Sequence, residues 1–400
     1  MKNLIAILGL TSILFTGCTS EDGKPTTTTP PPPAAVVGEF KGDASANKTY
    51  VKGTYNLDGV VRIKSGVTVT FEAGSVIIAN NTVGSTFDAI VVENGGKINL
   101  IGTAAEPIVC THATKVAGSW GGIVVYGNAP IVGAAGVTTS NAEDGISPST
   151  GGTAYVYGGT DAAHSSGVLK YVRVEYAGKK IADGNSELNG FSFYAVGSGT
   201  VLENLVSYKG NDDGFEFYGG TVSAKNLISY GNSDDSFDWQ DGWRGQDNTN
   251  WYAYQSETGN YGMEIESKNF DNAFWPVVSG ITLKRAPGTL TEDGTPQYDA
   301  IQFKSRGNGF YSNVVISGYT NPLATAVRIQ DVGTNTSQVN ASKIKFTDIK
   351  INDGTSSFAA KDATFTVAFP PANFVLSATA TGATIAPGAW AVVGTVNLLQ

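Results

Sequence analysis

The sequence has few of the side chains that most metal and redox centres require. Its 400 residues include only two cysteines, two methionines and two histidines. A zinc enzyme is therefore poorly supported, because zinc sites draw mainly on Cys and His ligands. Cys110 lies in a short apolar run and is predicted to be a small core side chain. Charged residues make up 15 %, compared with roughly 25 % in an average soluble domain.

Clusters of basic residues and long apolar runs are also missing. The net charge is −9 and Lys and Arg are scattered, which argues against nucleic acid as a partner. No segment after the first 20 residues has 18 uninterrupted apolar residues, so we predict no membrane-spanning helix. The hydrophobic fraction of 41 % is nevertheless enough for a core, which excludes general disorder.

The first residues read as an export signal. A short basic start is followed by an apolar run over 4–15 and then by Thr16-Gly17-Cys18. Small residues before a cysteine resemble the lipobox of bacterial lipoprotein signal peptides. The resemblance implies that residues 1–17 are removed and that Cys18 is acylated, for example with palmitate. An ordinary secretory signal cut nearby is the alternative.

Residues 18–38 are predicted to be a tether. Acidic residues follow Cys18, in a pattern that resembles the surface-export signals of Bacteroidota-type lipoproteins, although a solvated tail would read the same way. The stretch 25–33 is rich in Thr and Pro and favours an extended, semi-rigid spacer. We therefore expect a lipid-anchored protein of the outer membrane, exposed at the cell surface.

The body of the chain is a repeat array. It contains 50 glycines, and short β-type runs alternate with Gly, Asn and Asp. Segment 204–208 (NLVSY) recurs as 226–230 (NLISY). Likewise, segment 212–217 (DDGFEF) recurs as 234–239 (DDSFDW), and both repeats have an offset of 22 residues. A period of 22 suits one coil of a parallel β-helix, whereas a β-propeller blade needs 40 or more residues.

The predicted fold is all-β, a right-handed parallel β-helix solenoid with loop insertions. We place the β-helix at 39–357 and a C-terminal β cap or small module at 358–400. Stacked coils turn equivalent residues into ladders. We expect an internal aromatic stack of Phe191, Phe215 and Phe237 and an asparagine ladder at Asn204 and Asn226. Loop insertions are expected at 138–159, 241–274 and 286–298.

Several longer strings resemble a known family. They are 100–109 (LIGTAAEPIV), 118–127 (GSWGGIVVYG), 157–159 (YGG), 167–178 (GVLKYVRVEYAG) and 212–220 (DDGFEFYGG). These strings are similar to those of Bacteroidota-type secreted or lipid-anchored β-helix surface proteins, whose biochemical role is generally unassigned. The resemblance runs from about residue 57 to residue 285 and implies the β-helix fold and a surface location.

Acidic residues concentrate in the two best repeats. Stacking at a period of 22 brings the Asp pairs of adjacent coils within about 5 Å on one edge. Such carboxylates can bind Ca²⁺, which takes six to eight oxygen ligands. Alternatively, they accept backbone N–H groups in Asx turns, or they act in acid–base catalysis. The candidate metal ligands are Asp212, Asp213, Asp234, Asp235 and Asp238.

Aromatic residues crowd the adjoining segment, where four of the six tryptophans lie. Exposed rings beside carboxylates and amides suit sugar stacking or a protein interface, although the rings could equally pack over the solenoid. The candidate ligand-binding residues are Glu216, Asp241, Trp239, Trp243, Arg244, Trp251 and Tyr252.

These patterns predict a non-catalytic, monomeric surface protein. It would bind a glycan or a partner protein through its Asp- and Trp-rich face, with Ca²⁺ as a structural cofactor. One alternative is a Ca²⁺-dependent polysaccharide lyase or a glycosidase. The arrangement resembles that of pectate lyases, where Asp-bound calcium neutralises a uronate and a Lys or Arg takes a proton. Lys209, Arg244 and Lys268 are the candidate bases. A subunit of an outer-membrane complex is a further alternative.

Overall fold

The computed structural model describes residues 36–80, 87–181, 186–271, 275–353 and 355–400. The predicted signal peptide, Cys18 and most of the tether lie outside the described residues. Within the described ranges, no helix is both long enough and apolar enough to cross a bilayer.

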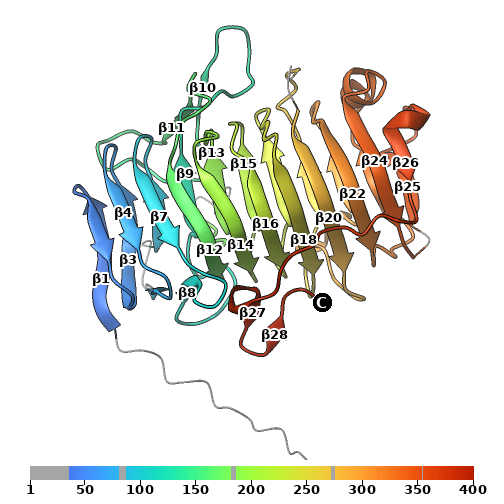
Figure 1. The fold of residues 1–400 in the computed structure, drawn as a ribbon. Helices are drawn as coiled ribbons and strands as arrows, with labels where there is room; N and C mark the ends of the chain where they lie inside the picture. Colours follow the sequence, from blue (N-terminus) through green and yellow to red (C-terminus); the bar gives the residue numbers. More distant parts are fainter. Residues whose placement is uncertain (1–35, 81–86, 182–185, 272–274, 354) are drawn as a thin grey trace, which may run out of the picture. The chain divides into compact units, whose positions relative to one another are not determined.

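The described chain winds into a stack of parallel coils. Parallel pairing joins 24 strands, and successive coils follow one another along the stack in the order of the colours in Figure 1. Each regular coil contributes strands to three faces, which we call faces A, B and C. The predicted all-β, right-handed parallel β-helix is therefore confirmed.

Faces A and B share long strands that bend in the middle. These strands are β12 (Gly167–Glu175), β14 (Val201–Tyr208), β16 (Ala224–Tyr230), β18 (Asn248–Gln255), β20 (Val277–Arg285), β22 (Gly309–Ser317) and β24 (Ile344–Ile351). Before them, face A has β2 (Lys48–Tyr50), β4 (Thr68–Phe71) and β7 (Lys97–Ile101), and face B has β5 (Val76–Ala79) and β8 (Ile108–His112). Strand β26 (Phe374–Leu376) pairs with β24 at the end of the stack.

Face C consists of short strands. They are β6 (Ala89–Val92), β9 (Ile123–Tyr126), β13 (Phe191–Tyr194), β15 (Phe215–Tyr218), β17 (Phe237–Gln240), β19 (Met263–Ile265), β21 (Ile301–Phe303), β23 (Thr325–Ile329) and β25 (Ser356–Ala360). In the first two coils, β1 (Val36–Ala44) and β3 (Thr54–Ile63) run from face B into face C.

The remaining elements lie outside the three faces of the stack. A hairpin of β10 (Thr139–Asn141) and β11 (Val156–Gly158) projects from the insertion between β9 and β12 (Figure 1). The short helical turns are η1 (Glu292–Gly294), α1 (Val332–Thr334), η2 (Asn335–Val339), η3 (Pro371–Asn373) and η4 (Ala389–Ala391), and β27 (Val392–Val393) pairs with β28 (Val396–Asn397). Insertions were predicted at 138–159 and 286–298, and the structure has loops there.

In the three consecutive strands β14, β16 and β18, an asparagine makes the bend between faces A and B. Asn204, Asn226 and Asn250 have φ values of 57°, 57° and 60°, a left-handed conformation that Asn tolerates better than most residues. Asn226 Nδ2 donates to Asn204 Oδ1 at 2.9 Å, and Asn250 Nδ2 donates to Asn226 Oδ1 at 3.1 Å. The predicted asparagine ladder is confirmed and extends by one coil.

The interior is filled by aromatic rings in register. Phe191 stacks on Phe215 with centroids 4.9 Å apart, and Phe215 stacks on Phe237 at 5.8 Å. All three side chains are fully buried, so the predicted internal stack is confirmed. Cys110 on β8 is also buried, as expected for a core side chain. Aromatic stacking and burial together stabilise the packing of adjacent coils.

The segment 241–274 is not the loop that the sequence analysis predicts. It contains β18, which pairs with β16 and β20, and β19, which pairs with β17 and β21. The segment therefore forms a regular coil. Its connecting loops differ in length from those of the two preceding coils, which hides the repeat in the sequence.

The C-terminal segment runs back along face B. Strand β25 crosses the predicted boundary at residue 357 and pairs with β23. Residues 377–400 then return over earlier coils (Figure 1). Asn313 Oδ1 accepts from Thr381 N at 2.7 Å, and Arg173 Nη1 donates to the carbonyl of Val392 at 2.8 Å. We call residues 377–400 the C-terminal strap.

Candidate acidic site on face C

Three carboxylates from consecutive coils form a row on the outside of face C. Strand pairing aligns Glu216 on β15 with Asp238 on β17, and Asp238 with Glu264 on β19. They point away from the core because they alternate with inward residues such as Phe215 and Phe217, which are fully buried. The row continues with Gln302 on β21 and Arg328 on β23.

Two aspartate pairs lie beside this row, in the turns that lead from face B to face C. Asp213 Oδ1 accepts from the backbone N–H of Asp235 at 2.9 Å, and Asp235 Oδ1 accepts from that of Tyr261 at 2.6 Å. The predicted stacking of the Asp pairs is confirmed. The bonds differ from an Asx turn, because each carboxylate reaches the next coil rather than the residue two positions on.

The carboxylate oxygens approach one another closely enough to share a cation. Three groups have oxygens within 4.8 Å of each other. They are Asp212, Asp213 and Asp234; Asp213, Glu216 and Asp238; and Asp235, Asp238 and Glu264. We call the residues in these groups the acidic face. A cavity of about 410 Å³ lies at its N-terminal end, between Glu143, Glu187 and Asp212.

Burial and mutual repulsion raise the pKa values of this site. Burial raises the pKa of Glu216 to about 8, and the charge of Glu143 adds to the shift. The pKa of Asp213 lies well above its usual range because the group is buried next to Asp212 and Asp235. Burial likewise raises the pKa of Asp238, with contributions from Glu216 and Glu264. Burial and the neighbouring carboxylates thus disfavour the charged form of these groups.

Hydrogen bonds satisfy only part of the site. Glu216 accepts from Asn189 Nδ2 at 2.7 Å, from Gln240 Nε2 at 3.0 Å and from the Tyr218 hydroxyl. In contrast, Asp238 Oδ1 is buried and has no hydrogen-bond partner among the described residues. The same holds for Oε1 of Gln302, whose side chain is 3 % exposed. Carboxylate and amide oxygens of this kind are the donors that Ca²⁺ prefers.

Basic side chains lie only at the margin of the acidic face. Lys304 Nζ pairs with Glu264 and lies 3.8 Å from Glu266. Burial lowers the pKa of Lys304, but Glu264 and Asp238 raise it by more, so its pKa ends above the usual range. In the described part of the chain, no Lys or Arg lies within 4.0 Å of an oxygen of Asp238.

The three predicted bases do not reach the acidic face. Lys209 pairs with Glu257 at 2.7 Å, and Lys268 pairs with Asp241 at 3.1 Å. Asp241 is itself buried and also accepts from the Tyr157 hydroxyl. Arg244 lines a different hollow, at the start of face A.

The predicted aromatic binding surface is wrong. Trp239, Trp243 and Trp251 are at most 1 % exposed, because their rings stack on one another and on Phe217 in the core. Tyr252 is 7 % exposed and its hydroxyl donates to the carbonyl of Gln400 in the C-terminal strap. These four residues fill the solenoid or anchor the strap and present no ring to a ligand.

Two residues of the site, Glu264 and Glu143, are not among those predicted from the sequence. Glu264 belongs to Gly262-Met263-Glu264-Ile265, which repeats the apolar–acidic–apolar pattern of the two preceding coils. This pattern indicates that Glu264 is the equivalent of Glu216 and Asp238 in the next coil. Glu143 comes from the long insertion and approaches Gln240 Nε2 at 2.7 Å, and nothing in the local sequence indicates that contact.

Comparison with known families gives one match. Residues 42–393 match the family described as the pectate-lyase like beta helix domain. Neither the curated proteins nor the solved structures include a match to the chain.

Proposed function

The chain belongs to the pectate-lyase-like β-helix family, and from this premise we propose that it binds an acidic polysaccharide through Ca²⁺ held on the acidic face. The proposed role is binding without catalysis, at the outer surface of the cell.

The observation that carries the proposal is the unbalanced charge of the acidic face. Glu216, Asp238 and Glu264 follow one another on adjacent coils, and only Glu264 has a lysine partner among the described residues. Asp238 Oδ1 is buried without a hydrogen-bond partner. Burying carboxylates together is costly unless a proton or a cation compensates them. A divalent cation compensates two of them at once.

The donor set suits calcium better than zinc or a small octahedral ion. Each of the three groups defined above combines carboxylates from two adjacent coils, so all the ligands offered to a cation are oxygens. Ca²⁺ accepts such flexible, all-oxygen shells with six to eight ligands. A bound Ca²⁺ makes this otherwise repulsive surface attractive to a uronate carboxylate, which can complete the shell.

Calcium titration tests the proposal directly. We expect Ca²⁺ to raise the unfolding temperature and to bind in isothermal titration calorimetry, and we expect Asp238→Asn to abolish both effects. Asp58→Asn is the matched control, because Asp58 is exposed on β3, away from the acidic face. The proposal fails if wild-type protein shows no calcium response, or if polygalacturonate and alginate bind equally well in EDTA.

The lipid anchor is a separate part of the proposal. Acylation of Cys18 would hold the β-helix at the outer membrane, where extracellular polysaccharide is accessible. Metabolic labelling with a palmitate analogue tests it, and Cys18→Ser is expected to abolish labelling and to release the protein from the membrane fraction. An unchanged membrane association of Cys18→Ser would remove this part of the proposal.

A second candidate function is cleavage of the bound polysaccharide. The family match and the pKa of about 8 for Glu216 favour it, since a carboxyl group that stays protonated at neutral pH can act as a general acid. Lys268 and Lys304, whose pKa values are raised, remain protonated and are poor bases for a lyase. Release of reducing ends that is lost in Glu216→Gln supports cleavage, and an intact polysaccharide supports binding alone.

A further inference from the structure

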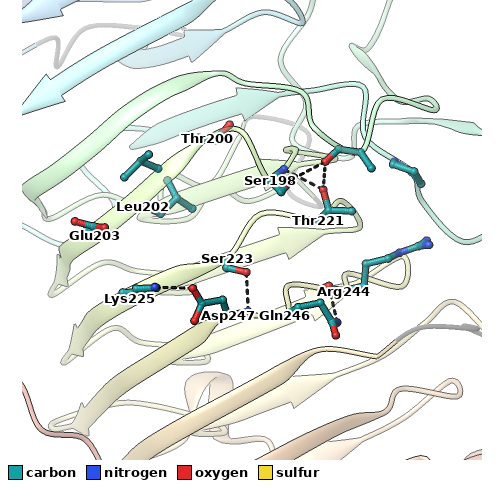
Figure 2. Close-up of a pocket in the computed structure, with 13 residues that line it drawn as sticks. Ser198, Thr200, Leu202, Glu203, Thr221, Ser223, Lys225, Arg244, Gln246 and Asp247 are labelled. Carbon is teal, nitrogen blue, oxygen red and sulfur yellow. Dashed lines mark hydrogen bonds and ion pairs between the residues drawn. The ribbon is translucent and has the colours of Figure 1, made fainter.

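A second hollow lies at the opposite edge of face C, where the turns lead into face A (Figure 2). Its volume is about 760 Å³, within the range of about 300–1,000 Å³ that is usual for ligand sites. Successive coils line it with Ser198 and Thr200, then Thr221 and Ser223, then Gln246. It shares no residue with the acidic face. We call it the hydroxyl groove.

Charges in the hydroxyl groove compensate each other. The lining includes two acidic residues, Glu203 and Asp247, and two basic residues, Lys225 and Arg244. Lys225 Nζ pairs with Asp247 Oδ2 at 2.5 Å, and Glu203 Oε2 pairs with Lys170 Nζ at 2.8 Å. With Lys170 included, three basic residues accompany two acidic ones, so the groove has no excess of negative charge that would attract a metal ion. This balance separates it from the acidic face.

The groove offers both donors and acceptors of hydrogen bonds. Ser223 Oγ accepts from the backbone N–H of Asp247 at 3.0 Å, which leaves its hydroxyl hydrogen available for a ligand. Asp247 uses one carboxylate oxygen for Lys225, and the other oxygen remains an acceptor. Lys225 has further N–H donors. A ligand whose groups both donate and accept, as sugar hydroxyls do, matches this set.

Apolar surface forms the rest of the lining. Val201 is 37 % exposed, and Pro130 and Ala162 approach from the insertion between β9 and β12. A sugar ring presents C–H groups on its face and hydroxyls at its edge, so it suits an apolar floor with a polar rim. The groove also runs across three coils, which repeat at about 4.8 Å.

We propose that the hydroxyl groove binds a neutral, linear oligosaccharide that lies along the stack across β14, β16 and β18. Binding there requires no cation and does not depend on the acidic face. The two sites together would let one coil stack hold an uncharged and an acidic stretch of glycan on opposite edges of face C.

The test uses the whole protein in EDTA, which removes any contribution of a cation site. Cellohexaose, xylohexaose and mannohexaose are the probes, measured by saturation-transfer NMR and by titration calorimetry. We expect at least one of them to bind. Ser223→Trp fills the groove and should raise the Kd of the bound oligosaccharide at least tenfold. Lys225→Met should raise the same Kd about threefold.

Thr70→Trp is the matched control, because Thr70 is a half-buried hydroxyl residue on β4, on the same face of the N-terminal coils. It should leave the Kd unchanged, and thermal unfolding verifies that each variant is folded. The proposal is overturned if none of the three probes binds at millimolar concentration, if folded Ser223→Trp binds as wild type does, or if a uronate oligosaccharide binds equally well in EDTA. The first two results would leave the calcium-dependent proposal untouched, whereas uronate binding in EDTA would contradict both proposals.

Discussion

The carboxylate of Asp213 accepts a hydrogen bond at 2.9 Å from the backbone N–H of Asp235, its equivalent in the next coil. Asp235 repeats the arrangement with Tyr261. Each side chain therefore bonds to the following coil and also contributes an oxygen to the acidic face. The same residues that join the coils are the ones proposed to bind the cation, so stability and calcium binding are linked.

Replacing Asp213 separates the two roles. Asp213→Ala removes the acceptor of a buried N–H group, which costs about 1–3 kcal/mol, so we expect a lower free energy of unfolding in EDTA. Asp213→Asn retains an acceptor oxygen and removes the charge. It should unfold in EDTA at or above the wild-type temperature but should lose part of the calcium response. Equal stability of the two variants in urea unfolding would contradict this account.

Stability without calcium should fall as the pH rises. The pKa of Glu216 is about 8 in the folded protein, compared with an ordinary value of 4.5. Between these values the folded state holds the proton more tightly than the unfolded chain, so stability is greatest below about pH 4.5 for this group and is lost up to about pH 8. Melting curves in EDTA between pH 5 and 8 measure the effect, and Glu216→Gln should flatten it.

Calcium binding should release protons. The pKa values of Asp213 and Asp238 lie above their usual range, so protons compete with a cation for these carboxylates. We expect the affinity for Ca²⁺ to increase from pH 5 to pH 8. Calorimetry in buffers of different ionisation enthalpy counts the protons, and an affinity that is independent of pH would argue against the site.

Trp243 should matter for stability and not for glycan recognition. Its ring is fully buried against Phe217, and its Nε1 donates to the carbonyl of Val222 at 2.9 Å. Trp243→Ala should cost about 3–5 kcal/mol, as other core aromatic truncations do. Trp275→Ala, at a half-buried position next to Phe310, is the control and should cost less. Chemical denaturation measures both.

The fold was predictable wherever adjacent coils have loops of equal length. Residues 209–214 and 231–236 both connect face B to face C, so Asn204 and Phe215 have visible equivalents 22 residues later. The next loops are longer, so Glu264 does not lie 22 residues after Asp238 in the sequence, although the two residues pair in the structure.

The error at the tryptophans has a physical reason. A high density of rings beside amides suggests exposure, whereas these rings fill the interior of the solenoid. Trp251 follows Asn250 as Leu227 follows Asn226, and it pairs with Leu227 on the inward side of the stack. The residue after each ladder asparagine points into the core, and this rule would have placed Trp251 correctly. Contacts from the long insertion, such as Glu143 with Gln240, depend on tertiary structure and leave no local pattern.

The C-terminal strap changes how the stack comes apart. A solenoid whose coils touch only their neighbours can fray from its ends, one coil at a time. Here residues 377–400 bond to Asn313 on β22, to Asn250 on β18 and to Arg173 on β12. An inner coil can therefore open only if the strap, which is bonded to coils on both sides of that coil, also detaches. The strap therefore makes the coils unfold together as one cooperative unit instead of one after another. Because local opening is suppressed, the middle coils are protected from proteases that cleave locally unfolded chain.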